Sequence, residues 1–211
     1  GVAHLFPKGH ICNLHPWEAN EVPVLLAEAF SGNFPIVCLH LTRPPVRTPD
    51  RTALGIPSHF EAARGAYVVR DYKKGKSPDG VIIARGTMSV YNLLGILPDL
   101  DNKFNLKIII AASRELFDLQ SAEYRRGVLT EGEFFDSMVV SNESRIATQS
   151  WIASPVNAEY ALTSDWDNRW RTGGTLEQII EESHLDPGHI LEGISKFVEE
   201  KDIRRKRIKS V

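Results

Sequence analysis

The fold is decided by the stretch Asn105-Leu-Lys-Ile-Ile-Ile-Ala-Ala-Ser-Arg-Glu-Leu-Phe-Asp-Leu-Gln-Ser-Ala-Glu-Tyr-Arg-Arg-Gly-Val128. From Leu106 to Ala112 it is nearly continuously apolar and rich in β-branched residues, which is typical of a strand covered on both faces in a parallel sheet. Ser113 and Ser121 each precede a helical pattern, in the position of an N-cap. A buried strand followed by helices predicts an α/β fold with this strand at the centre of the sheet.

The rest of the chain repeats this alternation. Further strands are predicted at Ile11–Leu14, Pro35–Leu41, Gly65–Val69, Asp79–Ala84, Asp136–Val140 and Tyr160–Leu162. Helices are predicted between Pro16 and Phe30, from Val90 to Leu97 with Pro98 as its end, and in two closing segments that start after Thr175 and Asp186. The alternation predicts three layers, a mostly parallel sheet with helices on both faces.

Residues 44–63 have the composition of a linker, because turn residues and prolines occur there without a hydrophobic period. We therefore divide the chain into a strand-helix-strand (βαβ) unit over residues 1–43, this linker, an α/β domain over residues 64–195, and a charged helix end and tail over residues 196–211. The βαβ unit alone cannot close a core, because its sheet has unpaired edges and its helix covers one face. The basic run Arg204-Arg-Lys-Arg-Ile-Lys209 is interpreted as a solvated tail.

Composition excludes several classes of partner. The 211 residues have a formal net charge of −2, 42% hydrophobic residues and a pI near 6.4, which gives no reason to expect nucleic acid or an anionic membrane. No apolar run approaches the length of a membrane span, and Cys12 and Cys38 form no Cys-x-x-Cys pair, so a reduced, cytoplasmic setting is expected. We also expect further sequence upstream of Gly1.

The segment Gly86-Thr-Met-Ser89 follows a predicted strand and opens a predicted helix. Backbone N–H groups at such a place can hold an anion, so Gly86, Thr87 and Ser89 are candidate ligands of a phosphate or sulfate. The glycines of a dinucleotide fingerprint or a P-loop are missing. A plain capped turn is therefore the alternative.

The seven histidines predict no metal site. His4, His10 and His15 are close in sequence but have no carboxylate at a recognisable metal spacing. His184 and His189 flank a proline, so they cannot share one face of a continuous helix. The chain also lacks the Gly-x-Ser-x-Gly turn of α/β hydrolases, and no catalytic residue is predicted.

Several motifs, taken together and in order, resemble the end of the pyrimidine-binding domain and the C-terminal domain of transketolase. They are Asn20-Glu21, Leu41-Thr-Arg43, Gly65–Val68, Glu115–Gln120 and Glu123–Arg125. His15 and Glu18 depart from the arginine and aspartate of the family's first motif. In the Gly86 loop, Arg85 and Met88 replace the family's threonine and glutamate.

The resemblance implies a section of a thiamine-diphosphate-dependent enzyme of the pentose phosphate pathway, which moves a two-carbon ketol unit between sugar phosphates. The chain lacks the Gly-Asp-Gly…Asn segment that holds Mg²⁺ and the diphosphate, and the glutamate that activates the cofactor. We therefore expect it to bind neither and to be inactive alone, with thiamine diphosphate and Mg²⁺ bound by an N-terminal section as its partner. A homodimer is expected for the complete enzyme.

The resemblance also implies that Arg43 contacts the phosphate of the sugar substrate. Its position just past the end of a predicted parallel strand agrees with this, because open α/β sheets bind ligands there and a guanidinium suits a phosphate.

Two hypotheses remain open. The first is the C-terminal section of a transketolase, as a truncated or processed product or as one half of a split enzyme. The second is a non-catalytic α/β binding or regulatory module that uses the Gly86 loop as an anion site.

Overall fold

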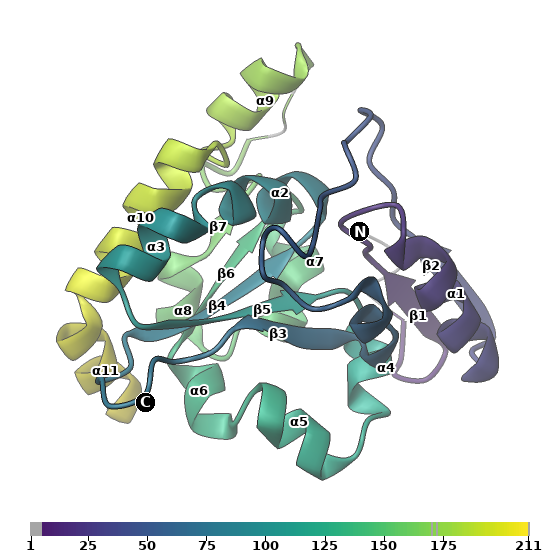
Figure 1. Ribbon diagram of the computed structural model, residues 1–211, viewed down its shortest axis with the longest axis horizontal. Helices are drawn as coiled ribbons and strands as arrows, with labels where there is room; N and C mark the ends of the chain where they lie inside the picture. Colours follow the sequence, from purple (N-terminus) through teal and green to yellow (C-terminus); the bar gives the residue numbers. More distant parts are fainter. Residues whose placement is uncertain (1–5, 170, 172, 211) are drawn as a thin grey trace.

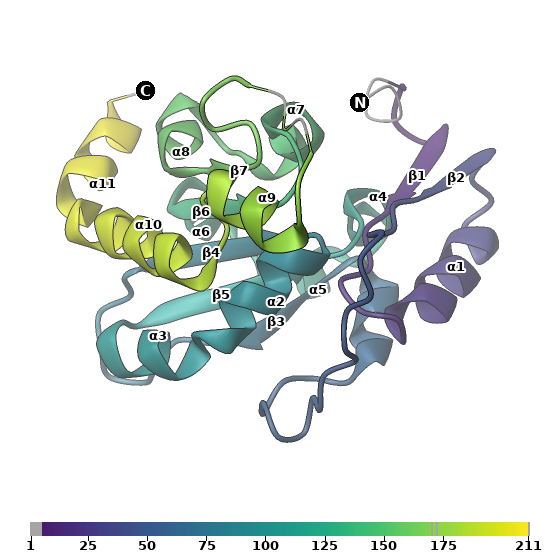
Figure 2. The ribbon, with the colours of Figure 1, turned by 90° about the horizontal axis from the view of Figure 1, so that it is seen from above.

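The computed structural model describes residues 6–169, 171 and 173–210, and its centre is a five-stranded sheet (Figure 1). The strands lie in the order β3 (Ala66–Arg70), β5 (Leu106–Ala111), β4 (Gly80–Arg85), β6 (Ser137–Ser141) and β7 (Leu162–Thr163). The last four are parallel, whereas β3 runs antiparallel to β5 at the edge. Helices cover both faces (Figure 2), so the predicted three-layer, mostly parallel α/β fold is confirmed.

Each strand buries alternate residues on opposite faces of this sheet. In β4, Ile82 points into one apolar cluster and Ile83 into the other. The first cluster is covered by α2 (Thr87–Gly95), α3 (Leu97–Lys103), α8 (Pro155–Tyr160) and α10 (Pro187–Glu199). The second is covered by α4 (Arg114–Asp118), α5 (Ala122–Val128), α6 (Glu131–Phe135) and the 3-10 turn η3 (Gln149–Trp151). Burial on both faces explains the continuous apolar runs of the central strands.

The helix starts predicted from capping residues are confirmed. Backbone N–H groups of the first turns donate to the side chains of Ser113 in α4, Ser121 in α5, Thr175 in α9 (Leu176–Glu182) and Asp186 in α10. The end predicted at Pro98 is wrong. Helix α2 ends at Gly95, and Pro98 lies in the first turn of α3, where its missing N–H breaks no helical hydrogen bond.

The basic run at the C-terminus is helical and one of its arginines is buried, so the prediction of a solvated tail is wrong in these two respects. It forms α11 (Lys201–Lys209), and Arg204 is fully buried. Its Nη2 donates to Asp136 Oδ1 at 2.7 Å, and its guanidinium lies 3.5 Å from the centroid of the Phe197 ring. The partner carboxylate follows α6, far away in sequence, and a local charge pattern cannot reveal it.

The predicted βαβ unit is present and packs beside the larger sheet (Figure 2). It consists of β1 (Ile11–Leu14), α1 (Glu21–Ser31) and β2 (Ile36–Leu39), with the two strands paired in parallel. Helix α1 contacts the 3-10 helix η2 (His59–Arg64), and β1 contacts α4. Apolar residues such as Leu14 and Leu25 join the first cluster of the five-stranded sheet, so the unit is docked on it.

We expect this N-terminal unit to open before the five-stranded sheet. β2 has a strand partner on one side only, and backbone held by few buried contacts opens at lower free energy. Native-state hydrogen exchange of the monomer at low concentration should give Ile36–Leu41 roughly tenfold less protection than Ile108–Ile110. Equal protection would show that residues 1–43 are an integral part of one domain and would contradict the boundary at residues 44–63.

Candidate functional site

The carboxyl ends of β4 and β6 form the switch point of the five-stranded sheet. The chain leaves β4 toward β5 on one side and leaves β6 toward β7 on the other side. In open α/β sheets, the crevice between two such strand ends is the usual place for a ligand. Arg85 ends β4, and Glu143 lies in the segment between β6 and α7 (Arg145–Thr148).

The predicted anion ligands Gly86, Thr87 and Ser89 lie here, at the start of α2. Gly86 has a φ of 84°, and a Cβ there would lie 2.4 Å from Asn142 Oδ1, so the position requires glycine. Thr87 Oγ1 donates to the carbonyl of Pro16 at 3.4 Å. Asn142 Oδ1 accepts hydrogen bonds from the Ser89 hydroxyl at 3.1 Å and from its N–H at 3.4 Å. Internal acceptors thus occupy the Thr87 hydroxyl and both donors of Ser89, and anion binding at this loop stays a prediction.

Arg43, the predicted phosphate ligand, lies in the segment that follows β2. It is exposed, and no other described residue forms an ion pair with it. Its guanidinium is therefore open to an anion from solution. No hydrogen bond or ion pair within the described residues joins it to the Gly86 loop.

A buried ionic cluster fills the switch point. Arg85 is 2% exposed, and its Nε lies 3.1 Å from Glu143 Oε2. The other oxygen of Glu143 contacts Nδ1 of His15, which directly follows β1 and donates its backbone N–H to the carbonyl of Ala112 at 2.7 Å. Burial lowers the pKa of the Arg85 guanidinium, and Glu143 opposes this shift. The N-terminal unit thus places a side chain in the crevice of the larger sheet.

His40, which directly follows β2, extends this cluster. Its ring stacks on His15 with 4.1 Å between the centroids and 8° between the planes. His40 Nε2 lies 3.2 Å from Asn13 Oδ1, and Asn13 Nδ2 donates to Glu115 Oε1 of α4 at 3.1 Å. The cluster therefore joins both strands of the N-terminal unit to the larger sheet. The sequence indicated only that His15 departs from the family pattern.

A second buried network holds α1. Glu21 is fully buried, and its Oε1 accepts hydrogen bonds from the Tyr67 hydroxyl at 2.6 Å and from Arg51 Nη2 at 2.7 Å. Trp17 Nε1 donates to the Tyr67 oxygen at 3.0 Å, and Arg51 also pairs with Glu18. Burial raises the pKa of the Glu21 carboxyl against these hydrogen bonds, and burial raises the pKa of Tyr67 well above its ordinary value. Tyr67 is therefore a hydroxyl donor at neutral pH.

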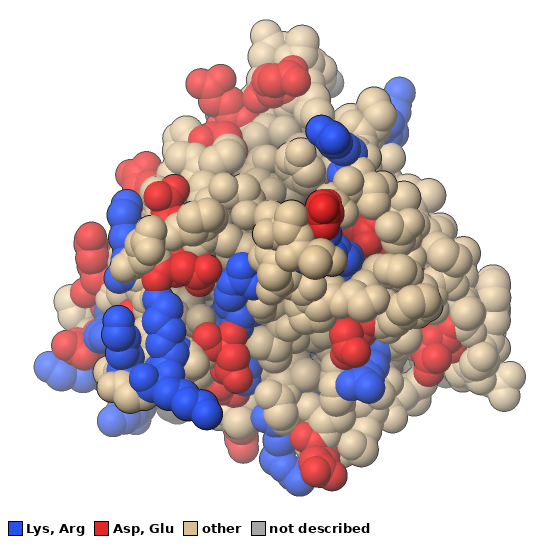
Figure 3. Space-filling view, viewed as in Figure 1, with Lys and Arg blue, Asp and Glu red and all other residues tan. Residues whose placement is uncertain are grey.

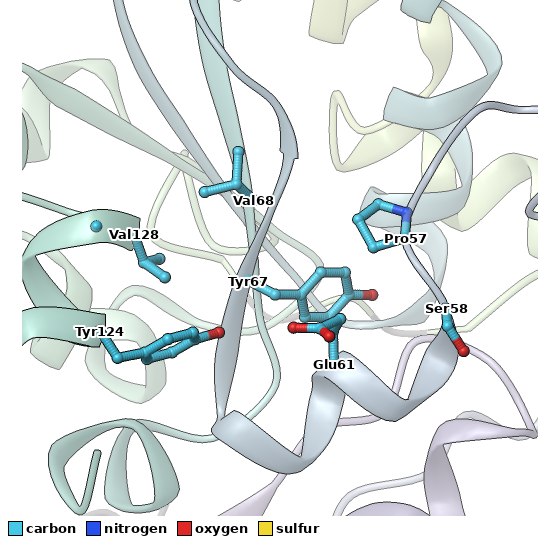
Figure 4. Close-up of a pocket in the computed structure, with 8 residues that line it drawn as sticks. Pro57, Ser58, Glu61, Tyr67, Val68, Tyr124 and Val128 are labelled. Carbon is cyan, nitrogen blue, oxygen red and sulfur yellow. The ribbon is translucent and has the colours of Figure 1, made fainter. Parts of the chain in front are cut away.

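An open pocket of about 360 Å³ lies beside the edge strand β3 (Figure 4). It is lined by Pro57, Ser58, Glu61, Tyr67, Val68, Tyr124, Gly127 and Val128. The Tyr124 hydroxyl donates to the Ala66 carbonyl at 2.9 Å and so covers part of the strand edge. Glu61 forms an ion pair with Arg64, and Tyr67 is already engaged by Glu21. These polar groups are therefore occupied, and we assign no reaction to this pocket.

Within the described residues, no three His, Cys, Asp or Glu side chains are grouped so that they could hold a metal ion. His184 and His189 stack with 4.1 Å between their ring centroids, and Asp186 contacts His189. His4 lies outside the described residues.

Burial raises the pKa of Cys12 to about 11, so this thiol is neutral at physiological pH. In the described part of the chain, no helix is long and apolar enough to cross a membrane.

We expect Glu21→Ala to destabilise the protein by about 3–5 kcal/mol, because it removes the shared acceptor of Arg51 and Tyr67 in a buried site. Glu21→Gln retains an acceptor oxygen and should cost less. Glu61→Ala is the control, since it breaks the partly exposed pair with Arg64 and should cost about 0–1 kcal/mol. Urea unfolding gives all three values. Equal losses for Glu21→Ala and Glu61→Ala would contradict a stabilising role of the network.

Comparison with known proteins shows similarity to parts of transketolases. No protein-family model matches the chain. It is 37% identical over 132 residues to a transketolase of Aquifex aeolicus, a match that covers 61% of this chain and 18% of that protein. It is 34% identical over 83 residues to transketolase 2 of Escherichia coli, covering 39% and 11%. The match thus spans less than a fifth of the length of either relative.

Solved transketolases share the fold. The enzyme from Leishmania mexicana matches with a TM-score of 0.71 at 18% identity, over 94% of this chain and 26% of that chain. The enzyme from Pichia stipitis with sedoheptulose-7-phosphate matches with a TM-score of 0.68 at 22% identity, again over 94% and 26%. A split gene transketolase, described as an inactive β4 tetramer, has a TM-score of 0.58 at 16% identity, over 95% of this chain and 60% of that chain. The resemblance seen in the motifs is therefore confirmed, and this chain is similar to a section of transketolase, in sequence over 132 residues and in fold over 94% of its length.

Proposed function

We propose that this chain is the C-terminal section of a thiamine-diphosphate-dependent transketolase of the pentose phosphate pathway. In this role it acts only together with an N-terminal section, and the complete enzyme transfers a two-carbon ketol unit between sugar phosphates. The observation that carries the proposal is the match to solved transketolases over 94% of the chain. So large a share includes the N-terminal unit as well as the five-stranded sheet, and this unit has no complete sheet of its own.

The outer edge of β2 supports a partner that supplies further strands. Ile36 and His40 donate their N–H groups to carbonyls on the β1 side, so the backbone groups of the alternate residues Val37 and Leu39 point away from β1. No third strand pairs with this sheet among the described residues. Parallel strands normally lie inside larger sheets, and an open edge is a template for another strand. We infer that the partner section continues the sheet from β2.

The surface of the same unit supports an apolar contact with that partner. Phe30, Leu41 and Ile36 are 67%, 62% and 43% exposed. Figure 3 shows a largely uncharged surface over the N-terminal unit, whereas charged side chains gather near α11. Exposed apolar surface of this kind marks an interaction site. The split gene transketolase, an inactive β4 tetramer, is a precedent for an incomplete chain that assembles without activity.

The residues of this chain do not fit thiamine diphosphate or Mg²⁺. The sequence has no Gly-Asp-Gly…Asn segment, and no group of three metal-ligating side chains occurs within the described residues. We therefore assign both to the N-terminal section. To this chain we assign a contact with the sugar phosphate through Arg43 and the surface on which the sections meet. The assembled enzyme would be a cytoplasmic homodimer.

Reconstitution tests the proposal. The chain is mixed with the part of the Aquifex aeolicus transketolase that lies outside the matched region, and transfer from fructose 6-phosphate to an aldose phosphate is assayed. We expect transfer in the mixture and none from either part.

Calorimetry tests the assignment of the cofactor. Titration of this chain alone with thiamine diphosphate and Mg²⁺ should release no heat of binding. A micromolar isotherm with this chain alone would overturn the assignment of the cofactor to the partner.

In the reconstituted enzyme, we expect Arg43→Ala to lower kcat/KM by roughly 10- to 100-fold, as for the loss of a charge-assisted contact of about 1.5–3 kcal/mol. The loss should appear mainly in KM, because the phosphate lies away from the reacting carbon. Arg47→Ala is the matched control, since this arginine is also exposed and lies four residues further along. An unchanged kcat/KM in Arg43→Ala would show that Arg43 is a surface residue without a contact to the substrate.

A further inference from the structure

The ionic cluster at the switch point is shared between two parts of the chain. His15 and His40 come from the N-terminal unit, whereas Arg85 and Glu143 come from the five-stranded sheet. These contacts cover the crevice in which open α/β sheets bind ligands. The attachment of the N-terminal unit is therefore sensitive to the charge of this cluster.

The hydrogen bonds indicate which nitrogen of His40 carries a proton. Asn13 donates its amide N–H to Glu115, so its Oδ1 faces His40 and accepts from Nε2. Nε2 of His40 therefore carries a proton in the docked arrangement. A second proton, on Nδ1, would turn the ring into a cation stacked 4.1 Å from the centroid of His15.

Burial makes that second proton costly, and the charges around the pair act in both directions. Among the described residues, the charged groups that face it are the Arg85 guanidinium and the carboxylates of Glu143 and Glu115. Glu143 already contacts both Arg85 and His15, and Glu115 already accepts from Asn13. Burial lowers the pKa of His40 and Arg85 adds to this, whereas the two carboxylates oppose it.

We propose that the stacked His15 and His40 form a proton-controlled latch, which holds the N-terminal unit on the five-stranded sheet at neutral pH and releases it in mild acid. In the released unit His40 is solvated and binds a proton at its ordinary pKa. The released form therefore binds more protons than the docked form, so docking weakens as the pH falls below the ordinary histidine pKa. Release would uncover Arg85 and Glu143. This latch does not depend on the proposed ketol transfer.

The latch is tested by the amide protection of the full chain at pH 7.5 and pH 5.5, measured by hydrogen exchange and corrected for the intrinsic exchange rate. We expect the protection of Ile11–Leu14 to fall severalfold between the two values, because the released form binds more protons than the docked form. The protection of Ile108–Ile110 should not change and serves as the internal reference. Protection of Ile11–Leu14 that does not depend on pH would overturn the proposal.

Two variants show whether the stack is responsible. His40→Gln keeps an N–H donor toward Asn13 but cannot take up a proton, so we expect equal protection of Ile11–Leu14 at both values of pH. His189→Gln is the matched control, because His184 and His189 stack with the same spacing and angle but lie on α10 and the turn before it. It should keep the response of the unaltered chain. A response retained in His40→Gln would overturn the assignment to this pair.

An NMR titration of the unaltered chain keeps the proposal testable if His40→Gln does not fold. The Cε1 proton of His40 should then titrate below the ordinary histidine pKa, in the range where Ile11–Leu14 lose protection. Titration of His40 at or above the ordinary value would overturn the proposal.

Discussion

Ile108 and Ile109 point to opposite faces of β5 and both are buried, and this double burial of the central strands is the constraint on which the rest of the structure depends. A sheet with two apolar faces must carry helices on both, so its faces have little room for polar side chains. Charged groups therefore lie at the ends of the strands, with Asp136 just before β6 and Arg85 at the carboxyl edge. Arg85 is at this edge, 2% exposed, and a guanidinium so deeply buried needs an acid beside it. Glu143 supplies that acid, and the N-terminal unit completes the enclosure with His15.

The N-terminal unit is held by polar networks as well as by apolar contact. Buried networks of this kind add little net stability compared with well-packed apolar residues, but a displaced partner leaves a buried charge unpaired. These networks therefore fix where the N-terminal unit sits on the sheet, and they contribute less to its stability. The network of Glu21, Arg51 and Tyr67 joins helix α1, the linker and β3. It therefore fixes the positions of three segments that are distant in sequence. The linker predicted from its prolines is thus partly fixed, and η2 occupies its final part.

Much of the fold was predictable because its causes are local in sequence. The β-branched run of β5 and the capping residues Ser113 and Thr175 act on neighbouring backbone, and a period or a cap can be found without knowing the tertiary structure. The features that the sequence did not predict depend on residues far away in the chain. Arg204 is buried because Asp136, 68 residues away, accepts its hydrogen bonds, and nothing in a basic run reveals this. The candidate site could not be predicted for the same reason, since His15 and Glu143 meet only when the N-terminal unit docks on the sheet.

The way the unit is attached bears on what its other side can do. Its polar contacts, through Asn13, His15 and Glu21, face the five-stranded sheet, whereas Phe30 and Leu41 are exposed to solvent. A small βαβ unit gains most of its stability from apolar burial, which a two-stranded sheet cannot complete. A cover over β2 and the exposed residues of α1 would supply the missing burial. A partner that extends the sheet there would stabilise the unit without competing for the ionic cluster. Binding of a partner on one side and protonation on the other would thus act on the same docked unit through separate contacts.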